Sequence, residues 1–187
     1  MQTTIQTTRL NGVDVDYIAQ TANAIKQDPE IAKFQFRAKN QWLDGGLNRT
    51  TINSFYGAKQ EQTRLKPFVL DADEPPVLAG TDQGANPVEY LLRALAGCMM
   101  TTMVYHAAIE GIRIDELEMD LEGDLDLQGF LRLSDQVRPG YNRIQVNFRV
   151  KTDPTNLQRL QELCQVSPVY DVTRNGTNIE INIQHKS

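Results

Sequence analysis

The sequence predicts an α+β protein in which strands, one long apolar helix, further strands, a second helix and a last strand follow one another. The run from Asn86 to Gly111 is apolar or small on nearly every side of a helix, and the segments around it alternate apolar with polar residues. No fixed-period repeat, low-complexity tract or linker divides the chain. A helix that is apolar on every face needs more cover than one small sheet, so we expect a dimer that buries its remaining side.

Composition excludes several classes of function. The chain has 187 residues, of which 40% are hydrophobic and 23% charged, and its net charge is −5. An acidic chain without a basic cluster is a poor partner for nucleic acid or for an anionic membrane surface. There is no signal peptide, so we expect a cytoplasmic protein, and two cysteines are too few for a secreted disulfide scaffold.

The first half of the chain predicts a short helix and then strands. Apolar residues recur at helical spacing over Val13–Gln27, and Asp28-Pro29 interrupts that pattern. Strands are expected from Phe34 to about Trp42, from Arg49 to Phe55 and from Pro67 to Leu70, with a glycine turn between the first two. We therefore predict an N-terminal extension with a short helix over residues 1–30 and a single domain over residues 31–187.

The long helix has clear start and stop residues. Asn86 is a good N-cap, Pro87 suits the first helical position, and Glu89 can return to the cap as its capping-box partner. Gly111 supplies the stop. Charged residues inside the run and an acidic, polar remainder favour a buried core helix over a membrane span.

After the helix, apolar and polar residues alternate strictly along the chain. Residues 112–127 predict a strand with an acidic polar face, and residues 144–150 predict a strand with a basic one. An antiparallel pairing of the two would set opposite charges across from each other. Asp153-Pro154 opens a second helix that reaches Cys164, and Ile179, Ile181 and Ile183 predict a last strand.

The two cysteines are the residues with the most chemistry to offer. Cys98 lies in the middle of the long helix, and Cys164 follows at the end of the second helix. His106 lies eight residues after Cys98, which places it about 12 Å further along the helix axis, too far to share a metal ion or to form a dyad. His185 falls in the polar tail. We therefore expect no metal site and no cofactor, and the cysteines are either packed as small hydrophobes or work as a redox pair.

The runs G-T-D-Q-G-A-N-P-V-E-Y-L-L-R-A-L-A-G-C and C-Q-V-S-P-V-Y-D resemble the OsmC/Ohr family, from about Asp71 to Ile183. The resemblance implies an OsmC-like fold, with antiparallel sheets around a long buried central helix in an intertwined homodimer. It also implies a cysteine-based peroxidase that reduces organic hydroperoxides in defence against oxidative stress. On this resemblance Cys98 attacks the peroxide and becomes a sulfenic acid, Cys164 resolves it as a disulfide, and a dithiol reductant reopens the disulfide.

The sequence departs from the better-characterised members directly after the N-P pair. In those enzymes a Glu at that position orients an activating Arg, whereas here the residue is Val88 and the Glu comes one position later. The resemblance favours Arg49 as the activating residue, with Arg37 and Arg64 as rivals.

The alternative hypothesis is a non-catalytic OsmC-like dimer that binds a small apolar ligand. Its pocket would lie near Cys98 and would be lined by residues such as Met99, Met103 and Tyr105. The departure at Val88 favours this second hypothesis, whereas the presence of Cys164 favours the peroxidase. A hydrolase is disfavoured because no Ser-His or Cys-His arrangement is found.

Overall fold

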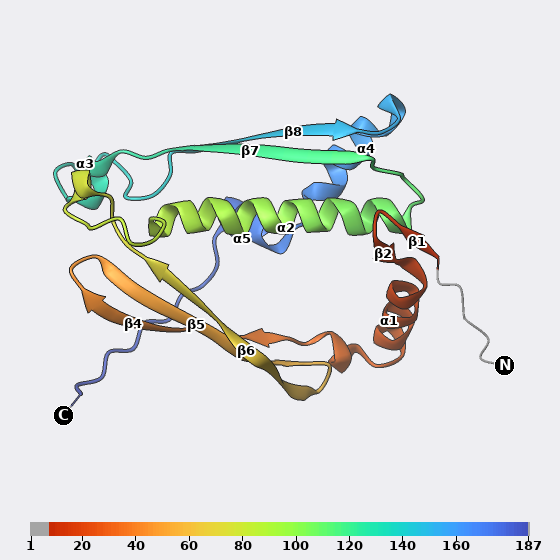
Figure 1. Cartoon of the computed structure of the whole chain (residues 1–187), viewed down its shortest axis with the longest axis horizontal. Coiled ribbons are helices and arrows are strands. Elements are labelled where there is room, and N and C mark those ends of the chain that lie inside the picture. Colours follow the sequence, from red (N-terminus) through yellow and green to blue (C-terminus); the bar gives the residue numbers. More distant parts are fainter. Residues whose placement is uncertain (1–7, 187) are drawn as a thin grey trace. The chain divides into compact units, whose positions relative to one another are not determined.

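A computed structural model describes residues 8–186, and the chain divides into two compact units, Met1–Leu91 and Leu92–Ser187. Residues 1–7 of the predicted N-terminal extension lie outside the described residues. The division into an extension over 1–30 and one domain over 31–187 stays a prediction. The architecture is the predicted α+β mixture, in which every strand pairing within a sheet is antiparallel (Figure 1).

The first unit opens with a small hairpin and the predicted short helix. Strands β1 (Arg9–Leu10) and β2 (Val13–Asp14) pair antiparallel, and helix α1 (Val15–Gln27) follows at once. Asp14 caps this helix, since its carboxylate accepts a hydrogen bond from the Tyr17 backbone N–H at 2.9 Å. The helix ends at the residue before Asp28-Pro29, as the sequence predicts, and a short 3₁₀ turn (η1, Pro29–Ala32) continues from there.

A four-stranded antiparallel sheet forms the rest of the first unit. Its central strand β5 (Leu47–Gly57) pairs with β3 (Gln35–Phe36), β4 (Lys39–Asp44) and β6 (Gln60–Ala72). The strand predicted from Phe34 to Trp42 is therefore two pieces, because residues 37 and 38 leave the ladder between β3 and β4. The other two predicted strands are confirmed, and both run further than the sequence pattern indicates. A 3₁₀ turn (η2, Pro76–Leu78) lies in the loop after β6.

The central helix α2 (Pro87–Ile109) begins at the predicted cap. The Asn86 side chain accepts a hydrogen bond from the Val88 N–H at 2.9 Å, and the Glu89 carboxylate accepts one from the Asn86 N–H at 2.8 Å. This is the reciprocal capping box that the sequence predicts. At the other end Gly111 has a φ of 75°, the left-handed conformation that stops a helix at low cost for glycine.

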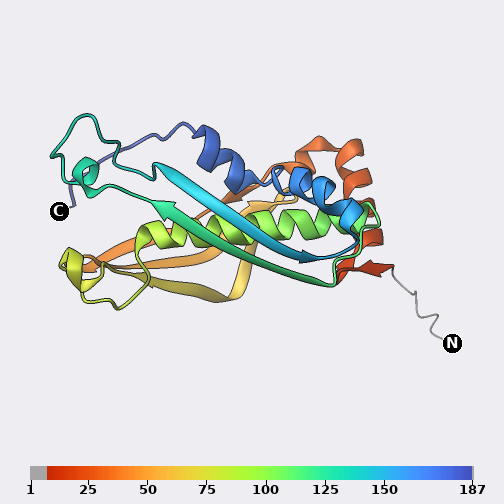
Figure 2. The ribbon, with the colours of Figure 1, turned by 90° about the horizontal axis from the view of Figure 1, so that it is seen from above.

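In the second unit a two-stranded ribbon covers one side of α2. Strands β7 (Glu116–Asp124) and β8 (Arg143–Lys151) pair along their whole length and run beside the helix (Figure 1), crossing it obliquely when seen from above (Figure 2). A short helix α3 (Leu127–Phe130) lies in the connection between them. Their outward faces carry the predicted cross-strand charge pairs, which include Lys151 with Glu116 at 2.6 Å and Arg149 with Glu118 at 3.0 Å.

Two short helices complete the core of the second unit. A 3₁₀ turn (η3, Pro154–Asn156) leads into α4 (Leu157–Cys164), and α5 (Pro168–Asn175) follows. The buried cluster combines α2 and α4 residues: Leu95, Met99, Met103, Ala107, Leu160, Leu163 and Cys164. The apolar faces of β7 and β8 pack against this cluster. Helix α5 is absent from the sequence prediction, although Ser167 caps it and Pro168 occupies its first turn.

The last predicted strand is not formed. Residues 177–186 carry no regular secondary structure, and the side chains of Ile179, Ile181 and Ile183 are 76%, 80% and 93% exposed. Alternation predicts which residues would share a face of a strand, but a strand also needs a neighbour for its backbone groups. Within the described chain this segment has no such neighbour. No described helix is long and apolar enough to cross a membrane.

Candidate functional site

Cys98 and Cys164 lie in the second unit, and both are free thiols. Cys98 is half-buried in the middle of α2, eleven residues after the helix begins at Pro87. The helix dipole stabilises a thiolate little at a mid-helix position, because the dipole acts mainly within the first and last turns. A reactive thiolate at this position therefore needs a cation from a side chain.

Cys164 has a different environment. It is the last residue of α4, it is 3% exposed, and its Sγ donates a hydrogen bond to the Gln161 backbone oxygen at 3.2 Å. Burial raises the pKa of the Cys164 thiol, because the charged thiolate loses its solvation there. This shift favours the neutral thiol at Cys164, whereas Cys98 is only half-buried.

The core cluster brings Cys164 beside the part of α2 that carries Cys98. Cys164 packs in one cluster with Leu95 and Met99. At about 100° per residue, Leu95 and Met99 lie at roughly +60° and +100° from Cys98, so both are on the same side of Cys98 around the helix. Cys98 therefore lies at the edge of the helix face that enters the cluster of Cys164, and it is not itself a member of that cluster.

A groove of about 620 Å³ opens on the same cluster. Its floor is apolar, with Met99 and Met103 from α2 and Leu160 from α4, and Cys164 forms part of its wall. Polar side chains from α4, α5 and β8 also line it: Asn147, Gln161, Gln165 and Tyr170. Of the three residues expected around a ligand pocket, Met99 and Met103 line this groove, whereas Tyr105 does not. Tyr105 is 46% exposed.

The three arginines proposed from the sequence all lie in the first unit, and each has partners there. Arg49 on β5 forms a bidentate ion pair with Asp71, with Nε–Oδ1 and Nη2–Oδ2 distances of 2.7 and 2.8 Å. Arg37 forms an ion pair with Glu61 at 2.8 Å. The two carboxylates raise the pKa of Arg49 and Arg37 by hydrogen bonding, so both guanidinium groups are firmly charged.

Arg64 on β6 is held differently. Its Nη1 donates to the Asn53 backbone oxygen at 2.6 Å, and its guanidinium lies 5.1 and 5.4 Å from the ring centroids of Phe55 and Phe68. The role of Arg49, and the choice among the three arginines, stays a prediction.

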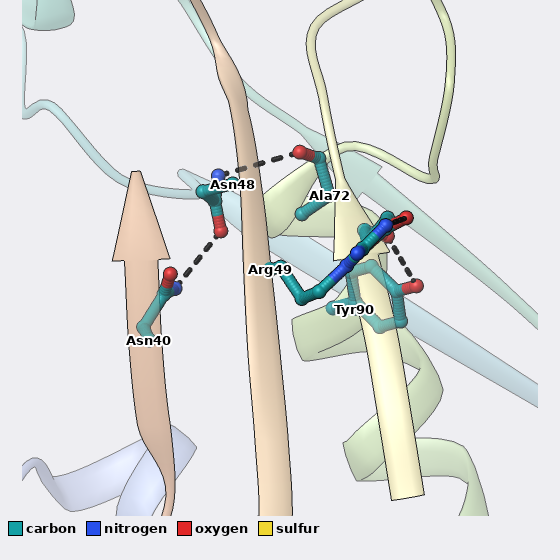
Figure 3. Close-up of polar contacts among 6 residues, drawn as sticks. Asn40, Asn48, Arg49, Ala72 and Tyr90 are labelled. Carbon is teal, nitrogen blue, oxygen red and sulfur yellow. Dashed lines mark hydrogen bonds and ion pairs between the residues drawn. The ribbon is translucent and has the colours of Figure 1, made fainter. Parts of the chain in front are cut away.

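A smaller groove of about 410 Å³ lies on one face of the first sheet, next to the first turns of α2. Asn48 is central to it: its amide donates to the Ala72 oxygen at 3.3 Å and accepts from Asn40 at 2.9 Å (Figure 3). Tyr90 closes one side, and its hydroxyl donates to the Asp71 backbone oxygen at 2.8 Å. Arg49 is next to Asn48 in β5 and so projects from the opposite face of the sheet.

The described part of the chain was also searched for clusters of side chains that could bind a metal ion. Over residues 8–186, no three side chains among His, Cys, Asp and Glu come together as a metal site would require. His106 remains in the last turn of α2, and His185 is exposed in the C-terminal segment.

The sequence and the fold can now be compared with those of known proteins. A sequence model of the family described as OsmC-like protein matches residues 80–182, more than half of the chain. The chain belongs to the OsmC family. The matched region of this OsmC family member contains both cysteines and all of α2, β7, β8, α4 and α5. No curated protein matches the chain.

Solved structures of OsmC-like proteins share the fold of this family member. The OsmC-like protein of Mycoplasma pneumoniae has a TM-score of 0.56 and 15% identity, covering 75% of this chain and 88% of that one. A candidate osmotic stress-induced and detoxification response protein of Psychrobacter arcticus 273-4 has a TM-score of 0.54 and 15% identity. The match covers 74% of this chain and 88% of that one.

A third structure carries a more specific description. It is the organic hydroperoxide resistance protein OsmC of Legionella pneumophila, described as a predicted redox protein and regulator of sulfide bond formation. It gives a TM-score of 0.51 and 14% identity, with 75% of this chain and 91% of that one covered. At these identities the similarity establishes the α+β fold of the family.

Proposed function

We propose that this OsmC family member is a thiol peroxidase that reduces organic hydroperoxides. The observation that carries the proposal is the packing of Cys164 in one cluster with Leu95 and Met99, which lie three residues before and one residue after Cys98 on α2. Membership of the OsmC family and the hydroperoxide resistance role given to the Legionella relative support the same activity. An apolar groove opens on this cluster, with Cys164 but not Cys98 in its lining, and apolar surroundings of this kind suit an organic substrate better than hydrogen peroxide.

The two thiols take different roles in the cycle. The Cys98 thiolate attacks the terminal oxygen of the hydroperoxide, the O–O bond breaks, and the alcohol leaves with a proton while Cys98 becomes a sulfenic acid. The Cys164 sulfur then attacks the Cys98 sulfur, water leaves, and a disulfide forms. A dithiol reductant reopens that disulfide and is itself oxidised. The burial that raises the pKa of Cys164 suits the second role, because a neutral thiol does not compete for the peroxide.

A homodimer is part of the proposal. Helix α2 buries one side in the core cluster, whereas Tyr105 and Ile109 on its second half are 46% and 48% exposed. The isoleucines of the C-terminal segment are exposed as well. A second copy of the chain would cover apolar surface of this kind.

Thiol counting before and after one equivalent of cumene hydroperoxide tests the peroxidase. The wild type should lose two thiols rapidly, Cys164→Ser should trap one oxidised thiol, and Cys98→Ser should lose none. If both thiols of the wild type stay reduced for minutes, the peroxidase proposal is wrong.

The second candidate is a non-catalytic dimer that binds a small apolar ligand. The groove lined by Met99, Met103 and Cys164 favours it, since an apolar floor with a few polar groups at the rim is typical of small-molecule sites. A fluorescent apolar probe that binds the wild type, and is displaced equally from wild type and Cys98→Ser, would support this candidate when thiol oxidation is absent.

A further inference from the structure

The run from Cys164 to Asp171 supplies part of the wall of the groove on the core cluster. Helices α4 and α5 follow one another beside α2 (Figures 1 and 2), and Cys164, Gln165 and Tyr170 from this run line the groove. The peroxidase cycle uses Cys164 alone from this run. A groove of about 620 Å³ is large enough for a small molecule, so the character of its lining indicates what kind of molecule fits.

Most of the lining is apolar. The apolar side chains come from three elements: Met99 and Met103 from α2, Leu157 and Leu160 from α4, and Ile144, Val146, Phe148 and Val150 from β8. The polar lining residues carry amide or hydroxyl groups, and none of the lining residues in the described chain is charged. An apolar chain that lies on this surface is removed from water, which is favourable.

Tyr170 is held at the wall of the groove by two contacts within α5. Its backbone N–H donates to the Oγ of Ser167, the fully buried N-cap of the helix, at 3.2 Å. One turn later, the Nη1 of Arg174 donates to the Tyr170 hydroxyl oxygen at 2.8 Å, and the guanidinium carbon lies 5.9 Å from the ring centroid. The backbone and the hydroxyl of Tyr170 are therefore both fixed.

The hydrogen bond from Arg174 determines which partner the Tyr170 hydroxyl can take. A phenolic hydroxyl has one proton to donate, and a guanidinium group has no lone pair that could accept it. The Tyr170 proton is therefore left for another acceptor, and the cation bound to its oxygen makes the hydroxyl a stronger donor. A negatively charged acceptor gains most, because hydrogen bonds to ionised groups are the stronger ones.

Arg174 also keeps its charge for such an anion. Within residues 8–186 no carboxylate lies within ion-pair distance of its guanidinium. Asp171, in the first turn of the same helix, accepts a hydrogen bond from the Asn175 amide at 2.7 Å. On α4, Glu162 pairs with Arg159 at 2.8 Å. The acidic side chains of the two helices are thus engaged with other partners.

We propose that this groove binds an apolar molecule with a terminal carboxylate. The carboxylate accepts the proton of the Tyr170 hydroxyl and is attracted by the charge of Arg174, while the apolar part lies on the α2 and α4 side chains of the groove. The proposal rests on the second candidate function and deepens it, because it names the chemical class of the ligand. It does not require the peroxidase cycle, since Cys98 is not in the lining.

Isothermal titration calorimetry with octanoate, on the reduced Cys98→Ser protein at about pH 8, tests the site, because the carboxylate is ionised there. Octanol is the matched ligand, since it has the same chain length without the charge. The parent protein should bind octanoate more tightly than octanol. Tyr170→Phe keeps the ring and removes the donor, so it should weaken octanoate binding by about 10-fold.

Three more variants separate the charge from the apolar surface. Arg174→Met should weaken octanoate binding by about 3-fold and leave octanol binding unchanged, because only the carboxylate is attracted by the guanidinium. Arg132→Met, the matched control, removes an exposed arginine of the same unit that does not line the groove, and it should change neither affinity. Leu157→Asn alters the apolar lining and should weaken both ligands alike. Circular dichroism would confirm that each variant keeps its helical content.

Equal affinities of the parent for octanoate and octanol would overturn the inference, as would an undiminished octanoate affinity in Tyr170→Phe or an equal loss in Arg132→Met. If both ligands bind without a preference for the carboxylate, the inference alone is wrong and the apolar site stands. If neither ligand binds, the inference and the second candidate function are both wrong. The peroxidase is decided separately, because the Cys98→Ser protein lacks the attacking thiol and thiol counting uses cumene hydroperoxide.

Discussion

Replacing Leu160 by alanine should be among the most destabilising single changes in the second unit. Leu160 is 1% exposed, lies on α4, and packs in the cluster with Met99, Met103 and Cys164. Leucine-to-alanine changes at buried positions cost about 3–5 kcal/mol, and the cost is smallest where the surroundings can relax. Because Leu160 borders the groove, its neighbours have room to shift, and we expect a loss of about 3 kcal/mol.

Leu157→Ala is the matched control for that experiment. Leu157 lies on the same helix and lines the same groove, but it is 48% exposed. Its truncation should therefore cost only about 1 kcal/mol, since half of its apolar surface stays in water. Urea unfolding followed by circular dichroism, with the slope m unchanged, would give both values. Equal losses for the two variants would refute the described packing of α4 on α2.

Three further predictions concern the cap, the ion pairs and the thiols. Asn86→Ala should lower the free energy of unfolding by about 1 kcal/mol, because it removes the side-chain acceptor of the first helical turn, whereas Asn86→Ser should keep most of it in the same urea assay. Arg159 lowers the pKa of Glu110 by hydrogen bonding, so this pair stabilises the fold above the ordinary pKa of a glutamate, and that contribution is lost as the pH falls through the lowered value. Thermal unfolding at falling pH should therefore show a shallower acid loss for Arg159→Gln than for the wild type, and parallel curves would contradict the pairing. Finally, a thiol reagent should modify Cys98 of the native protein well before Cys164, which is 3% exposed, and the order should vanish in urea.

Local patterns predicted the elements well where neighbours in sequence determine the structure. The capping box at Asn86 and Glu89 forms as expected, because all of its atoms lie within one turn. The alternation in β7 and β8 predicted both strands and their charge pairs, although β7 covers only Glu116–Asp124 of the expected residues 112–127 and Leu127 instead begins α3. Helix α5 was missed although Ser167 and Pro168 carry the usual start pattern, since its eight residues are too few for a visible apolar period.

The failed prediction at the C-terminus has a different cause. The alternation of Ile179, Ile181 and Ile183 is typical of a strand, and these residues are exposed in a segment without a neighbouring strand. Pairing is a non-local property, so a pattern along the chain cannot supply it. The candidate site has the same limit. The sequence predicts the two cysteines, but which arginine could act on Cys98 depends on non-local packing, and Arg49, Arg37 and Arg64 each have partners within the first unit.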